Sequence, residues 1–494
     1  MAMLELDATA IYVALPQMAR SLGGTPAELQ WVISVYALTL ASLVLFFGSL
    51  ADYWGHRRLL IVGLASFTVA SLGAAMSANV GVLIASRVAQ GIGGAMIFAV
   101  SPAILARTFR TAKSSYAFGL FAAAAGIAVA LGPLVGGVLV QLAGWRFVFA
   151  ANVPVGIIAL LLAAIRLGES PGKRLSVFSW LKGSTVAVVI GMVALTGLFA
   201  TSLPELALPT VVGLVALLAA VILFERTTNR TVGLLRRPSR ERSFYGISAA
   251  ALLGSATLSA TMFLLVAYLQ GVKNHSPASA GVQILPWTVA ISVSSYVWSR
   301  FPNRRHTSMM LSISLAVISC GIAAGIVVDS QSSWLFMLPM MIVSGIGFGL
   351  MQPSRLLSAT AGAGPTFVGK DTGLNQTFYL LGTVFGVSAI SSFFQWRLYA
   401  ESTERFASAV QPADLGLIVE RISSGRFDPF SYQSGSVALT NFYEKANEIY
   451  LSALRGSLLL AAGFALAGAA LAFVLIRSSA ANAYGVGRRE KDGG

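Results

Sequence analysis

Long apolar segments separated by short polar gaps dominate this sequence, and fourteen of them are long enough to cross a membrane. About 20 apolar residues at about 1.5 Å each span a hydrocarbon core of about 30 Å. The pattern predicts an all-α integral membrane protein whose helices follow one another as six, two and six. The predicted helices cover 1–20, 30–51, 59–77, 80–105, 115–140, 146–165, 184–202, 206–224, 245–270, 279–299, 308–328, 333–353, 373–395 and 456–476.

Composition supports this prediction, because 56% of the 494 residues are hydrophobic and only 11% are charged. Soluble globular proteins carry about 25% charged residues. The single cysteine, Cys320, excludes a disulfide within the chain, and the three histidines lie in gaps between helices, so we expect no metal site. No pattern of a nucleotide site or an enzyme is present, and we expect no cofactor. The first apolar segment is slightly short, so we expect the natural start to lie upstream.

The net charge of +15 is distributed unevenly over the gaps between the predicted helices. If the N-terminus is cytoplasmic, the inner gaps and the C-terminal tail hold 24 basic residues and the short outer gaps hold three. The positive-inside rule then predicts cytoplasmic termini, with the basic residues facing anionic lipid rather than nucleic acid. The long segment 397–455 is expected to be an extracellular loop with one or two short helices, acting either as a cap or as a solvated spacer.

One acid lies inside an apolar helix, in the stretch LDATAIYVALP from Leu6 to Pro16. An ionised carboxylate such as Asp7 costs several kcal/mol at hydrocarbon depth unless it is protonated, paired or hydrated, so it is a functional candidate. Arg87 is interpreted as the one basic residue well inside a helix and as its partner. The pair is expected either to carry protons or to form a structural lock between the first and fourth helices. Glu5 is placed at the inner mouth or in the cavity.

Four further stretches combine small residues with charges or proline at predicted helix ends and contacts. They are GSLADYWGHRR (48–58), RVAQGIGGA (87–95), AVALGPLVGG (128–137) and WRFVFAANVPVG (145–156). Glycines permit close helix contacts and a proline interrupts the hydrogen-bond ladder of a helix. The predicted conformational residues are Gly48, Asp52, Gly55, Arg57, Arg58, Gly132, Pro133, Gly136 and Gly137.

These motifs, in this order, resemble the major facilitator superfamily, and more narrowly its fourteen-helix drug:proton antiporter branch. The second half adds Tyr268-Leu269-Gln270 and SPASAG before Leu285-Pro286. The sequence departs from the family pattern at Tyr12, Tyr53, His56 and Ala128. The resemblance implies the major facilitator fold, with a six-helix bundle over 1–166, two additional helices over 167–243 and a second six-helix bundle over 244–494.

The resemblance also implies a monomeric transporter in the cytoplasmic membrane that exports lipophilic small molecules in exchange for protons. The central cavity should lie between the two bundles. Its candidate lining residues are aromatic residues, which more often serve packing, and amides, which are costly against lipid. They are Tyr12, Trp31, Tyr36, Gln90, Gln270, Gln283, Trp287, Gln352, Asn375 and Gln376.

The last six predicted helices contain no acid at midplane depth. We therefore expect a neutral or monovalent substrate rather than a divalent cation. Two alternatives remain open from the sequence. One is an exporter of a lipid or a secreted metabolite on the same fold, and the other is a membrane receptor that does not transport.

Overall fold

The computed structural model describes residues 1–23, 26–108, 113–168, 241–299, 307–327, 333–360, 368–406 and 439–489. Their regular structure is entirely helical. The predicted helices at 184–202 and 206–224 lie outside the described residues, so the count of fourteen remains a prediction.

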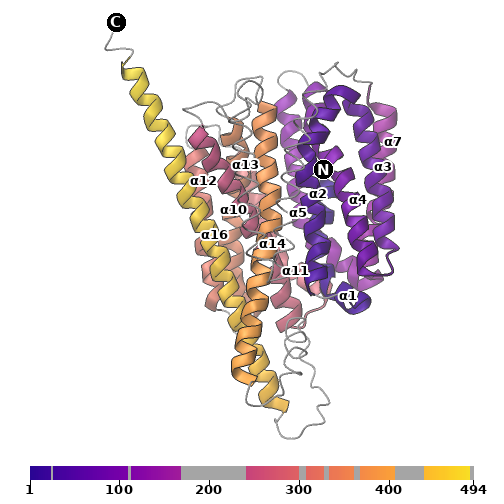
Figure 1. Cartoon of the computed structure of the whole chain (residues 1–494), viewed down its shortest axis with the longest axis vertical. Coiled ribbons are helices and arrows are strands. Elements are labelled where there is room, and N and C mark those ends of the chain that lie inside the picture. The colour runs from indigo at the N-terminus through magenta and orange to yellow at the C-terminus, as the bar shows by residue number, and fades with distance from the viewer. Residues whose placement is uncertain are drawn as a thin grey trace, which may run out of the picture.

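The first part of the chain forms a group of helices that pack against one another (Figure 1). Close contacts join α1 to α5, α2 to α4, α3 to α4 and α3 to α7. The elements are α1 (Ala2–Leu22), α2 (Pro26–Trp54), α3 (His56–Ala75), α4 (Val80–Thr108), α5 (Lys113–Ala143), α6 (Arg146–Ala150) and α7 (Asn152–Arg166). We call this group the N-half.

The second part forms another group, the C-half, in which α10 packs against α14 and α16, and α12 packs against α13 and α16. Its elements are α10 (Glu241–Val266), η2 (Ala267–Val272), α11 (Pro277–Ser299), α12 (Thr307–Ala323), η4 (Ala324–Val327), η5 (Trp334–Met337), α13 (Leu338–Thr360), α14 (Val368–Phe406) and α16 (Leu439–Arg489). In Figure 1 the C-half lies beside the N-half, and α16 follows its far edge.

Nine helices of the described part are long and apolar enough to cross a membrane. Apolar side chains such as Leu142, Ile165 and Val327 are largely exposed on the bundle surface. Exposed apolar surface of this kind is stable against lipid tails but not against water, which agrees with a multi-pass membrane protein.

Two predicted helices change geometry along their length. The helix predicted at 146–165 breaks at Ala151 into α6 and α7, because Pro154 has no N–H to donate to the preceding turn. The helix predicted at 245–270 ends in the π-helical η2. Such wider turns reposition side chains and are frequent at functional sites.

Segment 397–455 was predicted to be an extracellular loop with one or two short helices, between membrane helices ending at 395 and beginning at 456. Both of these bounds are wrong, because α14 continues to Phe406 and α16 begins at Leu439, each in one piece with its membrane helix. Arg397 and Glu401 pair on one turn of α14, and Arg405 bonds Glu448 of α16 at 2.8 Å. These polar pairs allow the two helices to continue together beyond the apolar region. Residues 407–438 lie outside the described part.

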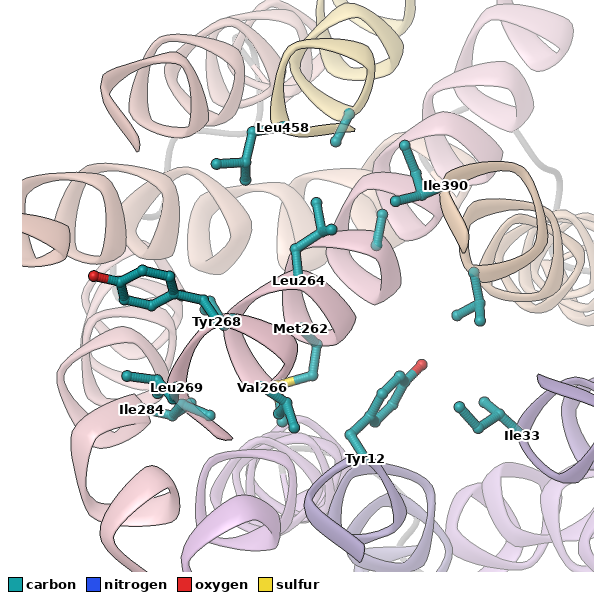
Figure 2. Close-up of a cluster of buried hydrophobic side chains, with 14 of the residues drawn as sticks. Tyr12, Ile33, Met262, Leu264, Val266, Tyr268, Leu269, Ile284, Ile390 and Leu458 are labelled. Carbon is teal, nitrogen blue, oxygen red and sulfur yellow. The ribbon is translucent and has the colours of Figure 1, made fainter. Parts of the chain in front are cut away.

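The two halves meet through α5 against α11 and α2 against α14. Figure 2 shows part of this interface, with Tyr12 of α1 lying between Ile33 of α2 and Met262 of α10. These side chains are buried, as is Val266 on the next turn of α10. The interface is therefore packed at this level.

Candidate functional site

The centre of the N-half contains an ion pair between α1 and α4. Asp7 is 0% exposed and Arg87 is 1% exposed, and Asp7 Oδ2 lies 2.5 Å from Arg87 Nη1. The other carboxylate oxygen of Asp7 accepts a hydrogen bond of 2.6 Å from Nδ2 of Asn152 at the start of α7. The structure thus brings the two predicted charged residues together and adds a third group on another helix.

Arg87 is held in place by more than the carboxylate. Its Nε donates to the carbonyl oxygen of Val32 in α2 at 3.0 Å, and its Nη1 donates to Oε1 of Gln90 at 3.0 Å. The guanidinium carbon lies 4.2 Å from the centre of the Tyr36 ring. A cation over an aromatic face is stabilised by the electron density of the ring. The arginine therefore keeps favourable partners that do not depend on the ionisation of Asp7.

Gln90 extends the network into α3, because its Nε2 donates to Oγ of Ser71 at 2.7 Å. Five helices of the N-half meet in this network, which we call the Asp7 centre. Sequence reasoning missed Asn152 and Ser71. The costly placement of an amide in a membrane helix, the argument that selected Gln90, applies equally to Asn152 and was a usable signal. Ser71 carried no such signal.

A second buried cation corrects the interpretation that Arg87 is alone inside a helix. Arg355 is 3% exposed in α13, which runs to Thr360 rather than ending near 353. The predicted helix 333–353 places Arg355 in the following inner gap, where the positive-inside rule expects basic residues. Here Pro353 lies inside the helix and Arg355 points into the protein.

Neutral side chains surround the Arg355 guanidinium. Nη1 donates to Oδ1 of Asn375 at 2.7 Å, and Nη2 donates to Oε1 of Gln376 and of Gln352, each at 3.1 Å. The ring centre of Tyr379 lies 4.3 Å from the guanidinium carbon. We call these five residues the Arg355 centre. Three predicted cavity residues therefore gather around an arginine that was not among the predicted site residues.

Glu5 is an acid of α1 whose charge acts on the Arg355 centre. Its half-buried side chain, two residues before Asp7 on α1, interacts electrostatically with Arg355 across the interface between the halves. The expectation that Glu5 lies at the inner mouth or in the cavity stays a prediction.

The other predicted cavity residues are dispersed. Gln270 Nε2 donates to the Val13 carbonyl oxygen at 3.1 Å and so joins the halves. Gln283 bonds Ser279 of its own helix, and Trp287 Nε1 donates to Ser344 at 3.1 Å, so both act locally within the C-half. Tyr12 lies in the interface of Figure 2.

Trp31 packs partly buried against a small cluster formed by α2 and α14. The described residues include no group of three histidine, cysteine or acidic side chains placed to hold a metal ion.

The glycines of α5 lie at two close helix contacts. A Cβ on Gly136 would come within 2.8–2.9 Å of Ala10 in α1, and one on Gly132 would collide with Thr9. A Cβ on Gly137 would instead collide with the Pro277 carbonyl oxygen at the start of α11. Pro133 is buried beside them and its carbonyl oxygen blocks a Cβ on Gly281 of α11. One stretch of α5 therefore touches both α1 and the other half.

The turn between α2 and α3 contains the other predicted conformational motif. Gly55 has φ 98°, in the region that favours glycine, and it precedes α3. Arg57 Nη2 donates to the Ala164 carbonyl oxygen of α7 at 2.7 Å, and Arg58 is exposed. Gly48 has open space around it, and the Asp52 side chain lies outside the described part.

Comparison with known proteins identifies the family of this arrangement. Residues 1–387 match the family model described as Major Facilitator Superfamily. The chain belongs to the major facilitator superfamily. Among curated relatives, it is 37% identical to the Methylenomycin A resistance protein of Bacillus subtilis over 65% of this chain and 69% of that protein. It is 32% identical to the Cephamycin export protein CmcT of Amycolatopsis lactamdurans, over 78% of this chain and 81% of the other.

Solved major facilitator structures show the same fold at low sequence identity. A bacterial homologue of the human lysosomal transporter Spinster, in an inward-facing and occupied conformation, matches with a TM-score of 0.66 at 14% identity, over 96% of this chain and 94% of that chain. The peptide transporter POT bound to alafosfalin matches with a TM-score of 0.61, also at 14% identity, over 96% of this chain and 94% of that chain. These matches confirm the predicted fold class.

Membership of this family makes the chain a multi-pass membrane transporter of small molecules and not an enzyme. The predicted family is therefore confirmed, and the receptor alternative is disfavoured.

Proposed function

We propose that this major facilitator transporter exports lipophilic, drug-like compounds across the cytoplasmic membrane in exchange for protons, by alternating access. The observation that supports this proposal is the fully buried Asp7–Arg87 pair, which places an ionisable acid inside the N-half. The relatives named for methylenomycin A resistance and cephamycin export support an outward direction of transport. Protons moving inward release about 2.3 kcal/mol per charge for each 100 mV of membrane potential.

Asp7 is the proposed proton carrier. Protonation of a carboxylate oxygen removes the negative charge, so the bond to Arg87 weakens from an ion pair to a hydrogen bond between a cation and a neutral acid. Arg87 would remain held by the Val32 carbonyl oxygen, Gln90 and the Tyr36 ring. Loading a proton therefore frees α1 from α4 without leaving the arginine unsolvated.

The movement of α1 is proposed to reach the C-half through α5. Gly132 and Gly136 contact Thr9 and Ala10, which lie within one turn of Asp7, and Gly137 of the same helix contacts Pro277. A shift of α1 against α5 thus changes the surface on which α11 rests. Alternating access requires the halves to rock about such contacts.

The described structure is proposed to represent the state closed toward the outside. Side-chain hydrogen bonds join the halves toward the ends of the helices predicted to face outward. Ser391 Oγ donates to Gln30 at 2.9 Å, and Ser276 Oγ donates to Gln141 at 3.0 Å. The proposed orientation has both termini cytoplasmic. A monomer suffices, because one chain supplies both halves and both charged centres.

The first test is transport driven by a pH gradient in proteoliposomes containing Asp7→Asn. The amide has nearly the shape of the acid and can still accept a bond from Arg87, but it binds no proton in this range. We expect uphill transport of a lipophilic dye to fall at least about 100-fold, while exchange of dye between both sides persists, because exchange needs no net proton movement.

Glu404→Gln is the matched control, since Glu404 is exposed near the end of α14 and makes no described bond. This variant should transport at the rate of the unmodified protein. Undiminished gradient-driven transport by Asp7→Asn would remove Asp7 as the carrier.

A further inference from the structure

The Arg355 centre differs from the Asp7 centre in its charge balance. Arg87 has an ionised partner at 2.5 Å, whereas the hydrogen bonds of Arg355 among the described residues all go to amide oxygens. Amides satisfy N–H groups but do not neutralise a charge. A buried cation without a direct counter-ion is unfavourable, so a carboxylate in contact with Arg355 would stabilise this centre.

The orientation of the amides is dictated by the arginine. A guanidinium can only donate hydrogen bonds, so the oxygens of Gln352, Asn375 and Gln376 must face it. Their NH₂ groups therefore point away, and Gln352 Nε2 donates to the Tyr379 hydroxyl oxygen at 2.7 Å. Because that oxygen accepts, the phenolic hydrogen is directed elsewhere. The N–H and O–H groups of the centre that are not used in these bonds can therefore only donate hydrogen bonds.

Three kinds of donor remain without a described acceptor in this centre. Arg355 makes four side-chain bonds from five N–H groups, with one Nη1 hydrogen left over. The Tyr379 hydroxyl and the Gln376 NH₂ group are the other two, and both side chains are half-buried rather than sealed. A positively charged group of unused donors is the arrangement that binds a carboxylate.

Glu5 is the described acid whose negative charge acts on Arg355. It acts on Arg355 from the other half, yet no ion pair or hydrogen bond of the Glu5 carboxylate occurs among the described residues. Glu5 also interacts with the amino group of Met1. Among the described residues, the charge of Arg355 is therefore compensated at a distance and not by direct contact with a carboxylate, and one Nη1 hydrogen has no acceptor.

We propose that the Arg355 centre is a substrate subsite that binds the carboxylate of a lipophilic monoanionic compound, with Glu5 balancing its charge when no substrate is bound. Arg355 and Tyr379 donate to the carboxylate, and the apolar remainder of the compound lies between the halves. The substrate carboxylate and Glu5 compete for the charge of Arg355, so a bound substrate replaces Glu5 as the group that balances this charge. This inference rests on the proposed export function and names its substrate class.

The subsite gives a physical reason for selecting anionic compounds. A cationic compound would be repelled by Arg355, and the C-half helices supply no described acid beside it to offset that repulsion. A neutral ester of the same shape would lose the charged hydrogen bonds but keep the apolar contacts. Such a loss amounts to roughly tenfold or more in affinity.

The test uses pyrenebutyric acid and its methyl ester as matched fluorescent probes of the purified full-length protein. Equilibrium binding is followed by energy transfer from tryptophan. We expect the unmodified protein to bind the acid at least about tenfold more tightly than the ester. Arg355→Gln should abolish that preference by weakening the acid alone. Arg20→Gln, which removes an exposed arginine bonded within its own helix, should leave the preference intact.

Glu5→Gln provides a second variant with an opposite expected sign. Removing the competing carboxylate should tighten binding of the acid several-fold and leave the ester unchanged. A merely structural role for Glu5 and Arg355 would weaken both probes together. This variant also decides the matter if Arg355→Gln does not fold.

Three results would overturn the subsite. They are equal binding of acid and ester by the unmodified protein, equal loss of both probes in Arg355→Gln, and weaker acid binding in Glu5→Gln. Proton-driven transport of the ester is measured separately in proteoliposomes, for the unmodified protein and for Asp7→Asn. This measurement tests the export function without reference to Arg355. Loss of the binding preference with transport intact would therefore overturn the subsite alone. Loss of transport with the binding preference intact would overturn the export function alone.

Discussion

At the scale of single residues, the described part of the chain contains two buried arginines, Arg87 and Arg355. Each lies on the fourth membrane helix of its half, α4 or α13, with a glutamine three residues away that bonds it. Their partners differ, because Arg87 is neutralised by Asp7 and Arg355 is surrounded by amides. The first arrangement suits a site that gains and loses a proton, and the second suits a site that binds an anion.

A single and a double variant at Arg87 and Asp7 measure how much the Asp7 centre contributes to stability, apart from its role in transport. Arg87→Met leaves Asp7 buried and without its cation, and we expect a loss of roughly 3–5 kcal/mol of unfolding free energy. Arg87→Met combined with Asp7→Leu removes both charges and should recover most of that loss. Thermal unfolding in detergent, followed by tryptophan fluorescence, measures both.

Neither variant should transport against a gradient, because neither retains the proposed carrier with its partner. Asp7→Leu alone completes the comparison. If the double variant loses as much unfolding free energy as Arg87→Met and Asp7→Leu lose together, the two residues contribute to stability independently rather than as a pair.

At the scale of elements, α5 connects the charged centre to the other half. Its glycines lie against α1 on one side and α11 on the other, where any Cβ would meet backbone or side-chain atoms. Close backbone contact without side chains lets neighbouring helices slide against each other. The π-helical end of α10 has a similar effect, since it places Gln270 where its amide reaches the α1 backbone.

Gly136→Ala tests this contact. The added methyl group would approach the Ala10 backbone to 2.9 Å, so α1 and α5 must separate. We expect a loss of about 1–3 kcal/mol in unfolding free energy and a lower transport rate.

Gly463→Ala in α16 is the control for Gly136→Ala, because nothing lies within 4 Å of its added Cβ. It should be neutral or slightly stabilising, as alanine favours helix over glycine. Equal melting temperatures for the two variants would show that α1 and α5 are not closely packed at this point.

At the scale of the whole molecule, the two halves are held together by separate contacts at their common interface. Hydrogen bonds between Gln30 and Ser391 and between Gln141 and Ser276 lie on opposite flanks of the interface, at α2 with α14 and near α5 with α11. Rocking of the halves has to break such neutral bonds, each of which contributes only about 1 kcal/mol. The interface is therefore suited to repeated opening.

Cross-linking tests whether these outer contacts must open during transport. Gln141→Cys and Ser276→Cys, introduced together with Cys320→Ser, can be joined by a short bifunctional methanethiosulfonate. We expect the cross-link to stop transport and a reducing agent to restore it. The reagent should have no effect on Gln141→Cys alone. Full transport by the cross-linked protein would show that this contact persists through the cycle.

The fold was largely predictable because hydropathy is a local property. In a bilayer every backbone group must be bonded within a helix, so long apolar segments can adopt little else. The prediction was weakest where polarity changes gradually. Arg355 was read as a boundary residue, and the ends of α14 and α16 were read as a loop, because a helix that continues past the apolar region leaves no hydropathy signal.

The sequence by itself determined that this is a helical membrane protein with an acid, Asp7, in a costly position. That much follows from local polarity and from the price of burying charge. Only the tertiary structure decided which groups pair with Asp7 or donate hydrogen bonds to it. Asn152 lies 145 residues from Asp7 in the chain yet bonds it at 2.6 Å. Glu5 and Arg355 come from different halves, and packing of helices distant in sequence brought them within electrostatic reach.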